Sequence, residues 1–234
     1  MRLNRYLAEC GVCSRRNADE MIAAGRVTVN GRKAETGMSV EQGRDTVFVD
    51  GKKIVPPVRY RYIMLNKPKG CVTTRSDDKG RKTVFDYVSA EERLVPVGRL
   101  DYDSEGLLIL TNDGELTNVL THPSHEIPKT YIVKIEGSIQ ESDLAILRKG
   151  VKTASVKYAP CRVKLLGEED GKSRLEVTIR EGKNREIRNM FAAVEKEVVL
   201  LRRVAVGDLR LGGLGRGCTR DLTEAEVDYL KSLS

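Results

Sequence analysis

Apolar residues recur three and four positions apart over residues 3–10 and again over 18–22, which predicts two short helices. Ser14 precedes the second stretch and is a residue type that caps helix N-termini. Apolar residues then alternate over 27–29 and 47–49, and each run is followed by an Asn-Gly or Asp-Gly turn pair. The first sixty residues therefore predict two helices followed by a small β unit.

The rest of the chain mixes both periods without a strict alternation of strands and helices. We expect strands at 62–65, 107–111, 130–136, 161–166, 174–180 and 198–204, and helices at 141–149, 185–196 and 224–232. Capping boxes that pair Ser138 with Glu141 and Thr223 with Glu226 mark the starts of two of these helices.

Pro56 and Pro57 interrupt any regular element and mark a domain boundary. We expect an α+β protein, because clustered strands with interspersed helices are typical of that class. A small αα-β domain over 1–57 is followed over 58–234 by a larger domain, a mostly antiparallel sheet with flanking helices.

Charge distribution points to the kind of partner. The 234 residues carry 41 Lys+Arg and 34 Asp+Glu, a net charge of +7, of which residues 1–82 hold +9 and residues 83–234 hold −2. Basic proteins commonly bind polyanions, so we expect affinity to reside mainly in the first third of the chain. No apolar run approaches the ~20 residues of a membrane helix, and the N-terminus lacks an apolar signal segment. We expect a cytoplasmic protein, not a membrane one, with reduced cysteines.

Metal, phosphate-loop and hydrolase motifs are poorly matched. Cys10 and Cys13 form a CxxC with no second ligand pair, so we interpret them as small apolar residues and expect no metal site. The acidic run over 98–106 imitates the start of a calcium loop but lacks its final glutamate, and a solvated turn explains its spacing better. The Gly-rich run over 212–217 is not placed between a strand and a helix and predicts a loop. The two histidines, His122 and His125, do not support a catalytic triad.

Four motifs in order nevertheless resemble one family. Residues 66–70 (NKPKG), 98–101 (GRLD) with 106–108 (GLL), 129–131 (KTY) and 181–188 (EGKNREIR) resemble the bacterial ribosomal RNA pseudouridine synthases. Residues 1–57 are similar to their N-terminal S4-type RNA-binding domain, which includes the stretch GRVTVNG. The resemblance covers essentially the whole chain.

The resemblance implies roles for individual residues. Asp101 matches the catalytic aspartate, Tyr131 the tyrosine that packs against the target base, and Arg188 the arginine that pairs with the catalytic carboxylate. The last motif departs from the family pattern at Glu186, where many relatives carry Gln, and at Asn189, where Arg is common. The residues expected to contact RNA are Arg2, Arg5, Arg15, Arg16, Arg26, Lys67, Arg99 and Arg185, with Arg99 a candidate for propping the space left by an extruded base. The basic segment 59–82 is expected to hold phosphates as well.

The chemistry of the implied reaction fits these residue types. Uridine becomes pseudouridine when the bond between ribose C1′ and base N1 breaks and C5 joins C1′, with no atoms gained or lost, so no cofactor is expected. A carboxylate can either attack C1′ or remove a ribose proton, and the sequence leaves both routes open. We expect an enzyme acting on ribosomal RNA, preferably of the large subunit, and a monomer. Alternatives are a small-subunit enzyme, a non-catalytic RNA-binding assembly factor, and a glycosidase that uses Asp101 with Asp103.

Overall fold

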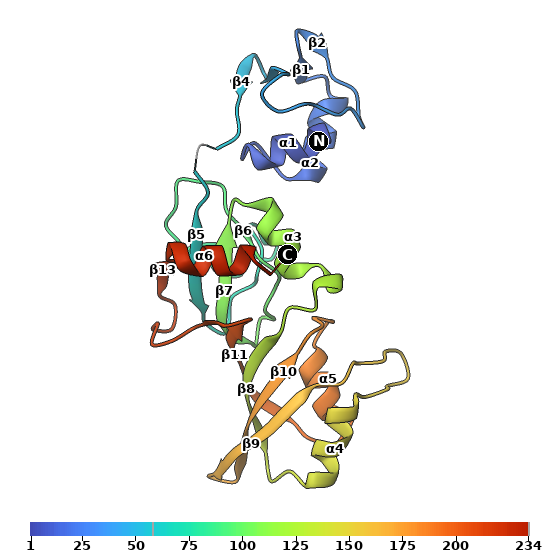
Figure 1. Ribbon diagram of the computed structural model, residues 1–234, viewed down its shortest axis with the longest axis vertical. Coiled ribbons are helices and arrows are strands. Elements are labelled where there is room, and N and C mark those ends of the chain that lie inside the picture. The colour runs from blue at the N-terminus through green and yellow to red at the C-terminus, as the bar shows by residue number, and fades with distance from the viewer. Residues whose placement is uncertain (58, 234) are drawn as a thin grey trace. The chain divides into compact units, whose positions relative to one another are not determined.

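The computed structural model describes residues 1–57 and 59–233, which form two compact units (Figure 1). The first contains Met1–Arg61 together with Ala90–Val95 and Thr111–Gly114, and the remainder forms the second. The domain boundary expected between residues 57 and 58 adjoins residue 58, which lies outside the described residues.

Two helices and a small sheet make the first unit, as the hydrophobic pattern predicts. The helices are α1 (Leu3–Glu9) and α2 (Arg15–Ala23), and the strands are β1 (Val27–Val29), β2 (Arg32–Lys33), β3 (Val47–Val49) and β4 (Lys52–Ile54). The antiparallel strands lie in the order β2-β1-β3-β4. The Ser14 Oγ accepts a hydrogen bond from the Asn17 N–H at 3.2 Å and so caps α2 as expected. Apolar residues of both helices and of β1 and β3 are buried in one core.

A mixed sheet organises the second unit, with strands in the order β13-β5-β7-β11-β8-β10-β9. These strands are β5 (Tyr62–Lys67), β7 (Glu105–Thr111), β8 (Lys129–Glu136), β9 (Arg162–Glu169), β10 (Lys172–Ile179), β11 (Val198–Val206) and β13 (Thr219–Asp221), and two short strands, β6 (Val95–Pro96) and β12 (Leu209–Arg210), add to it. The helices are α3 (Gly114–Thr121), α4 (Glu141–Lys149), α5 (Glu186–Ala192) and α6 (Glu224–Lys231), with 3-10 turns at Val84–Tyr87 and Pro123–His125. Helix α6 crosses β5 and β7, and its Leu230 joins the core formed with Met64 and Leu107 (Figure 1).

The sheet is mostly antiparallel, as expected, but β7 and β11 pair in parallel. Gly106 allows this pairing, because a Cβ built on it would lie 2.1 Å from the backbone oxygen of Arg203. Its φ of +109° also lies in a region that favours glycine. The strand that follows the acidic loop can therefore enter the sheet beside β11.

Three local expectations were wrong. Helix α3 was not predicted, because its apolar face rests on little more than Leu116 and Leu120. Helix α4 begins where expected, but the carboxylate of Asp143, rather than a Ser138 capping box, accepts the Gln140 N–H at 3.2 Å. Helix α5 is shorter than predicted at both ends: Arg185 before its start has a φ of +49°, and Glu195 after its last residue has a φ of +57°, and neither conformation belongs to a right-handed helix. The Thr223–Glu226 capping box of α6 is confirmed.

Candidate active site

A cavity of about 1020 Å³ lies within the second unit, and both Asp101 and Tyr131 line it. Asp101 is half-buried on the loop that precedes β7. Within residues 1–57 and 59–233, no side chain or backbone group forms a hydrogen bond or an ion pair with its carboxylate. Tyr131 lies on β8, opposite Val177 of β10 and Arg203 of β11, and is 8% exposed. A carboxylate that is unpaired among the described residues and an aromatic side chain thus line one partly open cavity.

Lys67 is hydrogen-bonded to the backbone of the loop that carries Asp101. Its side chain is fully buried at the end of β5, and its Nζ donates hydrogen bonds to the backbone oxygens of Pro68 (3.1 Å), Asp101 (3.0 Å) and Ser104 (2.9 Å). Burial lowers the pKa of this amine, and the nearby carboxylates of the loop oppose the shift. The expectation that Lys67 contacts RNA was wrong, because a side chain with no exposed surface cannot reach a phosphate. Lys67 instead fixes the backbone on which Asp101 is carried.

Arg188 approaches the same loop from α5, but it pairs with Asp103. Its Nη2 lies 3.2 Å from the Asp103 Oδ2 and 3.2 Å from the Asp103 backbone oxygen, and its Nη1 donates to the Val198 backbone oxygen at 2.7 Å. The expected direct pairing with Asp101 was therefore wrong for this structure. Asp101 still contributes to the electrostatic environment of Arg188. Burial lowers the pKa of the Arg188 guanidinium, and the charge of Asp103 opposes that shift.

Two further predicted residues line the cavity. Arg99 is exposed and has no hydrogen-bond or ion-pair partner in the described part of the chain. Arg185 is exposed at the start of α5 and lies 3.4 Å from the Asp103 carboxylate. Both cations are placed where an RNA phosphate could reach them.

A half-buried lysine and a buried glutamate, to which the sequence analysis gave no role, form another part of the cavity wall. The Lys129 Nζ donates to the backbone oxygens of Ile127 (3.1 Å) and Glu181 (3.4 Å), and burial lowers its pKa. Burial also raises the pKa of Glu186, whose Oε2 accepts the Lys183 backbone N–H at 2.8 Å. Glu186 therefore closes the turn over 183–186, a role that the side-chain oxygen of a glutamine could also fill. Lys129 is the first residue of the KTY motif, and this motif was the only feature of the sequence that could have marked Lys129 as part of the site.

The charge of the cavity differs from that of its surroundings. The described residues that line it include seven Lys and Arg but four Asp and Glu. Residues 83–234 as a whole carry −2. The fold therefore concentrates positive charge where a polyanion would enter, a distribution that the net charge of the segment does not indicate.

The predicted RNA-contacting arginines of the first unit differ in their availability. Arg15 and Arg16 are exposed in the first turn of α2 and have no side-chain partner in the described part of the chain. Arg5 donates to Glu9 at 2.6 Å, and the Arg26 Nε donates to the Asp50 carboxylate at 3.0 Å. Arg2 donates to the Gly37 backbone oxygen. Arg15 and Arg16 thus offer free positive charge, whereas a carboxylate already neutralises Arg5 and Arg26.

The CxxC pair and the Gly-rich run have structural surroundings in this protein. Cys10 and Cys13 pack against the core of the first unit, and burial raises the pKa of the Cys10 thiol to about 11. Residues 212–217 form a loop, in which Arg216 lies 3.4 Å from the buried Glu105 carboxylate. Across residues 1–57 and 59–233, His, Cys, Asp and Glu side chains do not gather in groups of three or more suited to a metal ion. Among the described helices, none has both the length and the apolar character to cross a bilayer.

Comparisons with known proteins agree with the motifs. The RNA pseudouridylate synthase family model matches residues 61–193, and the S4 domain model matches residues 1–47. The chain is 44% identical to ribosomal large subunit pseudouridine synthase B of Bacillus subtilis, covering 100% of this chain and 96% of that protein. It is 41% identical to an uncharacterized RNA pseudouridine synthase of Aquifex aeolicus, covering 98% and 93%. A crystal structure of a pseudouridylate synthase superposes with a TM-score of 0.72 at 29% identity, covering 98% of this chain and 99% of the other.

Proposed function

Because this chain belongs to the RNA pseudouridylate synthase family, we propose that it isomerises a specific uridine of large-subunit ribosomal RNA to pseudouridine. The observation that supports this most is the carboxylate of Asp101, which has no partner among the described residues and lies in a cavity shared with Tyr131. The names of two relatives favour the large subunit: that of Bacillus subtilis, 96% of which the chain covers, and that of Xanthomonas campestris, 49% of which it covers.

Asp101 supplies the group that starts the reaction. In one route its carboxylate oxygen bonds to ribose C1′ while the C1′–N1 electron pair leaves with the uracil. In the other route the carboxylate takes a ribose proton as the same bond breaks. In both routes the uracil turns and C5 bonds to C1′. As it does so, the bond between the Asp101 oxygen and C1′ breaks in the first route, and Asp101 returns the proton to the ribose in the second. The proton on C5 is finally transferred to N1. Asp101 regains its charge at the end, so the isomerisation is balanced without a co-reactant.

Tyr131 positions the uracil, and Lys67 positions the loop that carries Asp101. A tyrosine beside the freed uracil retains it by stacking, which is worth about 1–3 kcal/mol per base. Lys67 restrains the Asp101 backbone through its hydrogen bonds to Asp101 and Ser104. The target uridine must leave its stack to reach this cavity, and Arg99 is our candidate for supporting the deformed RNA.

The two units divide docking from chemistry. We infer that the first unit binds RNA phosphates through Arg15 and Arg16, because these cations are exposed and free in the described part of the chain. The cavity of the second unit contributes additional contacts through Arg99 and Arg185. Truncation of residues 1–57 should therefore weaken RNA binding and reduce its salt dependence, while slow conversion persists at high RNA concentration.

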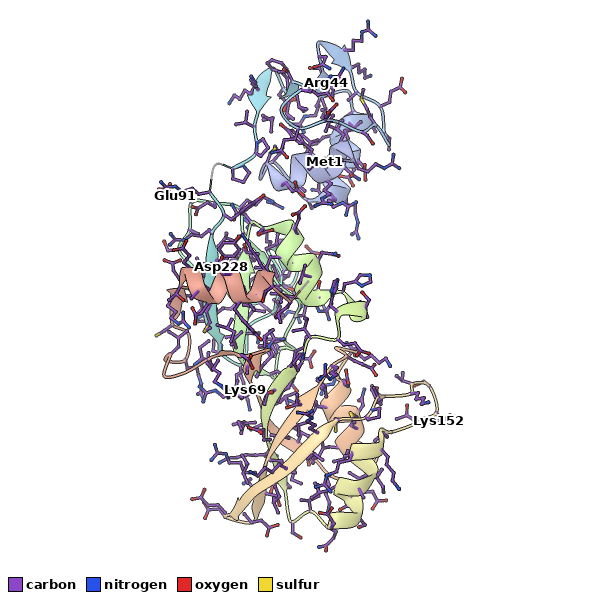
Figure 2. All side chains as sticks on the ribbon, in the orientation of Figure 1. Met1, Arg44, Lys69, Glu91, Lys152 and Asp228 are labelled. Carbon is purple, nitrogen blue, oxygen red and sulfur yellow. The ribbon has the colours of Figure 1, made fainter. Side chains whose placement is uncertain are left out.

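The direct test replaces Asp101 with Asn, which preserves side-chain size and removes the negative charge. Purified wild-type protein and the variant are incubated with a large-subunit rRNA fragment, and pseudouridine is detected by carbodiimide treatment and primer extension. We expect the wild type to produce a stop at one uridine and Asp101→Asn to produce none. Asp228→Asn, which alters an exposed residue of α6 (Figure 2), is the matched control and should match the wild type. Wild-type conversion rates in Asp101→Asn would overturn the assignment, and a stop confined to small-subunit rRNA would overturn the choice of subunit.

A further inference from the structure

One face of the sheet in the second unit is open to solvent over the strands β8, β10 and β11. Buried positions alternate with accessible ones along these strands, so that Val133 and Ile135 are buried while Ile132 and Lys134 reach the surface. Helices α4 and α5 pack against β9 and β11 (Figure 1). An antiparallel sheet commonly has one face on a core and the other in water, and the accessible positions form that second face.

Four cations lie on this open face, and each comes from a different strand: Lys134 from β8, Lys164 from β9, Arg174 from β10 and Arg202 from β11. We call these four residues the basic face. The strand register places them in two adjacent rows, one with Lys134 opposite Arg174, and one that runs through Arg202, Ile132, Glu176 and Lys164. Glu176 is the one carboxylate in these rows, so four positive charges and one negative charge leave a net charge of +3.

The cations of the basic face are not neutralised within the chain. None of them forms a hydrogen bond or an ion pair with another of the described residues, and Glu176 forms no ion pair either. The Nε of Arg202 is buried and has no hydrogen-bond partner in the described part of the chain. Lys134 lies directly opposite Arg174, and like charges in this position destabilise a sheet. An anion bound from outside would relieve that repulsion.

We propose that the basic face binds the phosphate backbone of a double-stranded segment of the substrate RNA, separate from the segment that presents the target uridine. The inference rests on the proposed function, which makes RNA the polyanion that this protein meets. None of the four cations lines the cavity, whereas their strand neighbours Tyr131, Leu201 and Arg203 do. The basic face and the cavity therefore contact different nucleotides.

The residue types on the open face favour phosphates over bases. Proteins hold single-stranded RNA largely by stacking its bases on aromatic side chains, and in the described strands the accessible positions beside the cations carry Thr130, Ile132, Thr178 and Leu200, with no aromatic residue. Lys and Arg contact phosphates without reading sequence. Four strands at a spacing of about 4.8 Å span about 14 Å, so the basic face contacts several phosphates of one backbone.

A duplex without uridine tests the basic face independently of catalysis. A fluorescent RNA duplex built only from G·C pairs is titrated with the full-length protein, and fluorescence anisotropy is measured at several salt concentrations. Reversing the two exposed cations, Lys164→Glu with Arg174→Glu, should raise the Kd about tenfold and reduce the slope of log Kd against log salt by about 2. The matched control reverses two exposed cations outside the face, Lys149→Glu with Arg210→Glu, and should change the Kd less than about twofold.

Arg174→Gln separates RNA binding from a merely structural role. This change removes the repulsion with Lys134, so thermal unfolding at low salt should give a Tm no lower than that of the wild type. The Kd for the duplex should nevertheless rise. With an rRNA fragment that contains the target uridine, KM should rise while kcat stays unchanged, because Arg174 does not line the cavity.

Two results would overturn the inference while the proposed function stands. One is a duplex affinity of the Lys164→Glu, Arg174→Glu protein equal to that of the wild type, which would leave the face to an acidic protein partner. The other is a lower Tm of Arg174→Gln with an unchanged duplex affinity, which would assign Arg174 to the fold. If the reversed protein does not fold, the same titration of Arg174→Gln decides.

The proposed function fails separately, if the wild-type protein forms no pseudouridine in any rRNA. The duplex titration requires no turnover, so a weaker affinity of the reversed protein would still show that the basic face binds RNA. A wild-type protein that does not bind the duplex would reject the basic face as a binding surface.

Discussion

The Nζ of Lys67 lies 3.0 Å from the backbone oxygen of Asp101, although the two residues are 34 positions apart in the chain. The same amine reaches the oxygens of Pro68 and Ser104. The first lysine of the NKPKG motif, which was expected to contact RNA, thus supports the loop of the proposed catalytic residue.

Replacing Lys67 with Met should therefore damage both stability and turnover. Three buried backbone oxygens lose a donor, and we expect the free energy of unfolding to fall by about 3 kcal/mol. Affinity for RNA should be retained in the folded fraction, because Lys67 is buried. Urea unfolding and RNA binding measure the two effects. Lys69→Met is the matched control, since Lys69 is exposed, and it should cost less than about 0.5 kcal/mol; a Lys67→Met variant that loses RNA affinity but no stability would reverse our assignment.

Gly106→Ala should destabilise the second unit by about 3 kcal/mol, because the new methyl group collides with backbone rather than with a movable side chain. The expected contact is 2.1 Å from the Arg203 oxygen, at a φ of +109°. Thermal or urea unfolding measures the loss. Gly213→Ala is the control, since a Cβ there meets nothing within 4 Å, and equal stability of the two variants would contradict the close parallel pairing of β7 and β11.

Stability should fall in acid partly because of Glu226. Hydrogen bonds from Arg220 lower the pKa of this carboxyl from 4.5 to about 2, and its two oxygens lie 2.7 Å from the Arg220 nitrogens. The unfolded chain binds more protons than the folded one between these values, so the stabilisation is complete above about pH 5 and is lost as the pH falls toward 2. We expect Glu226→Gln to cost about 1 kcal/mol at pH 7 and progressively less at lower pH.

Urea unfolding of both proteins between pH 2.5 and pH 7 checks this dependence. A difference in stability that stays constant over the whole range would mean that the Glu226 charge does not contribute.

The salt dependence of RNA binding should distinguish free from neutralised arginines in the first unit. Arg15→Gln and Arg16→Gln should each reduce the slope of log Kd against log salt by about 0.7 for a single-stranded contact. Arg26→Gln should have a smaller effect, because Asp50 already pairs with Arg26. Fluorescence anisotropy with an rRNA fragment at several salt concentrations measures the slopes, and equal losses in all three variants would show that RNA displaces Asp50.

Much of the architecture follows from local pattern. The periodicity of apolar residues correctly predicts α1, α2 and the main strands, because burial of one face requires that spacing wherever the element packs. Helix α3 escapes the pattern because two leucines on one face are too weak a signal. The pattern also does not show that α5 starts only after Arg185, because a left-handed backbone conformation leaves no mark in hydropathy.

The sequence by itself determined the class of the fold, the family and the residues from which the proposed active site is built, because short motifs carry the chemical groups that a reaction needs. Only the tertiary structure decided which of those groups touch. Arg188 and Asp103 are 85 residues apart and meet because α5 and the loop before β7 pack against β11. Lys67 turns inward for a similar reason, since the loop carbonyls outcompete water for its amine once β5 is buried. Charge and spacing name candidates, but burial and direction depend on contacts between segments that are distant in the chain.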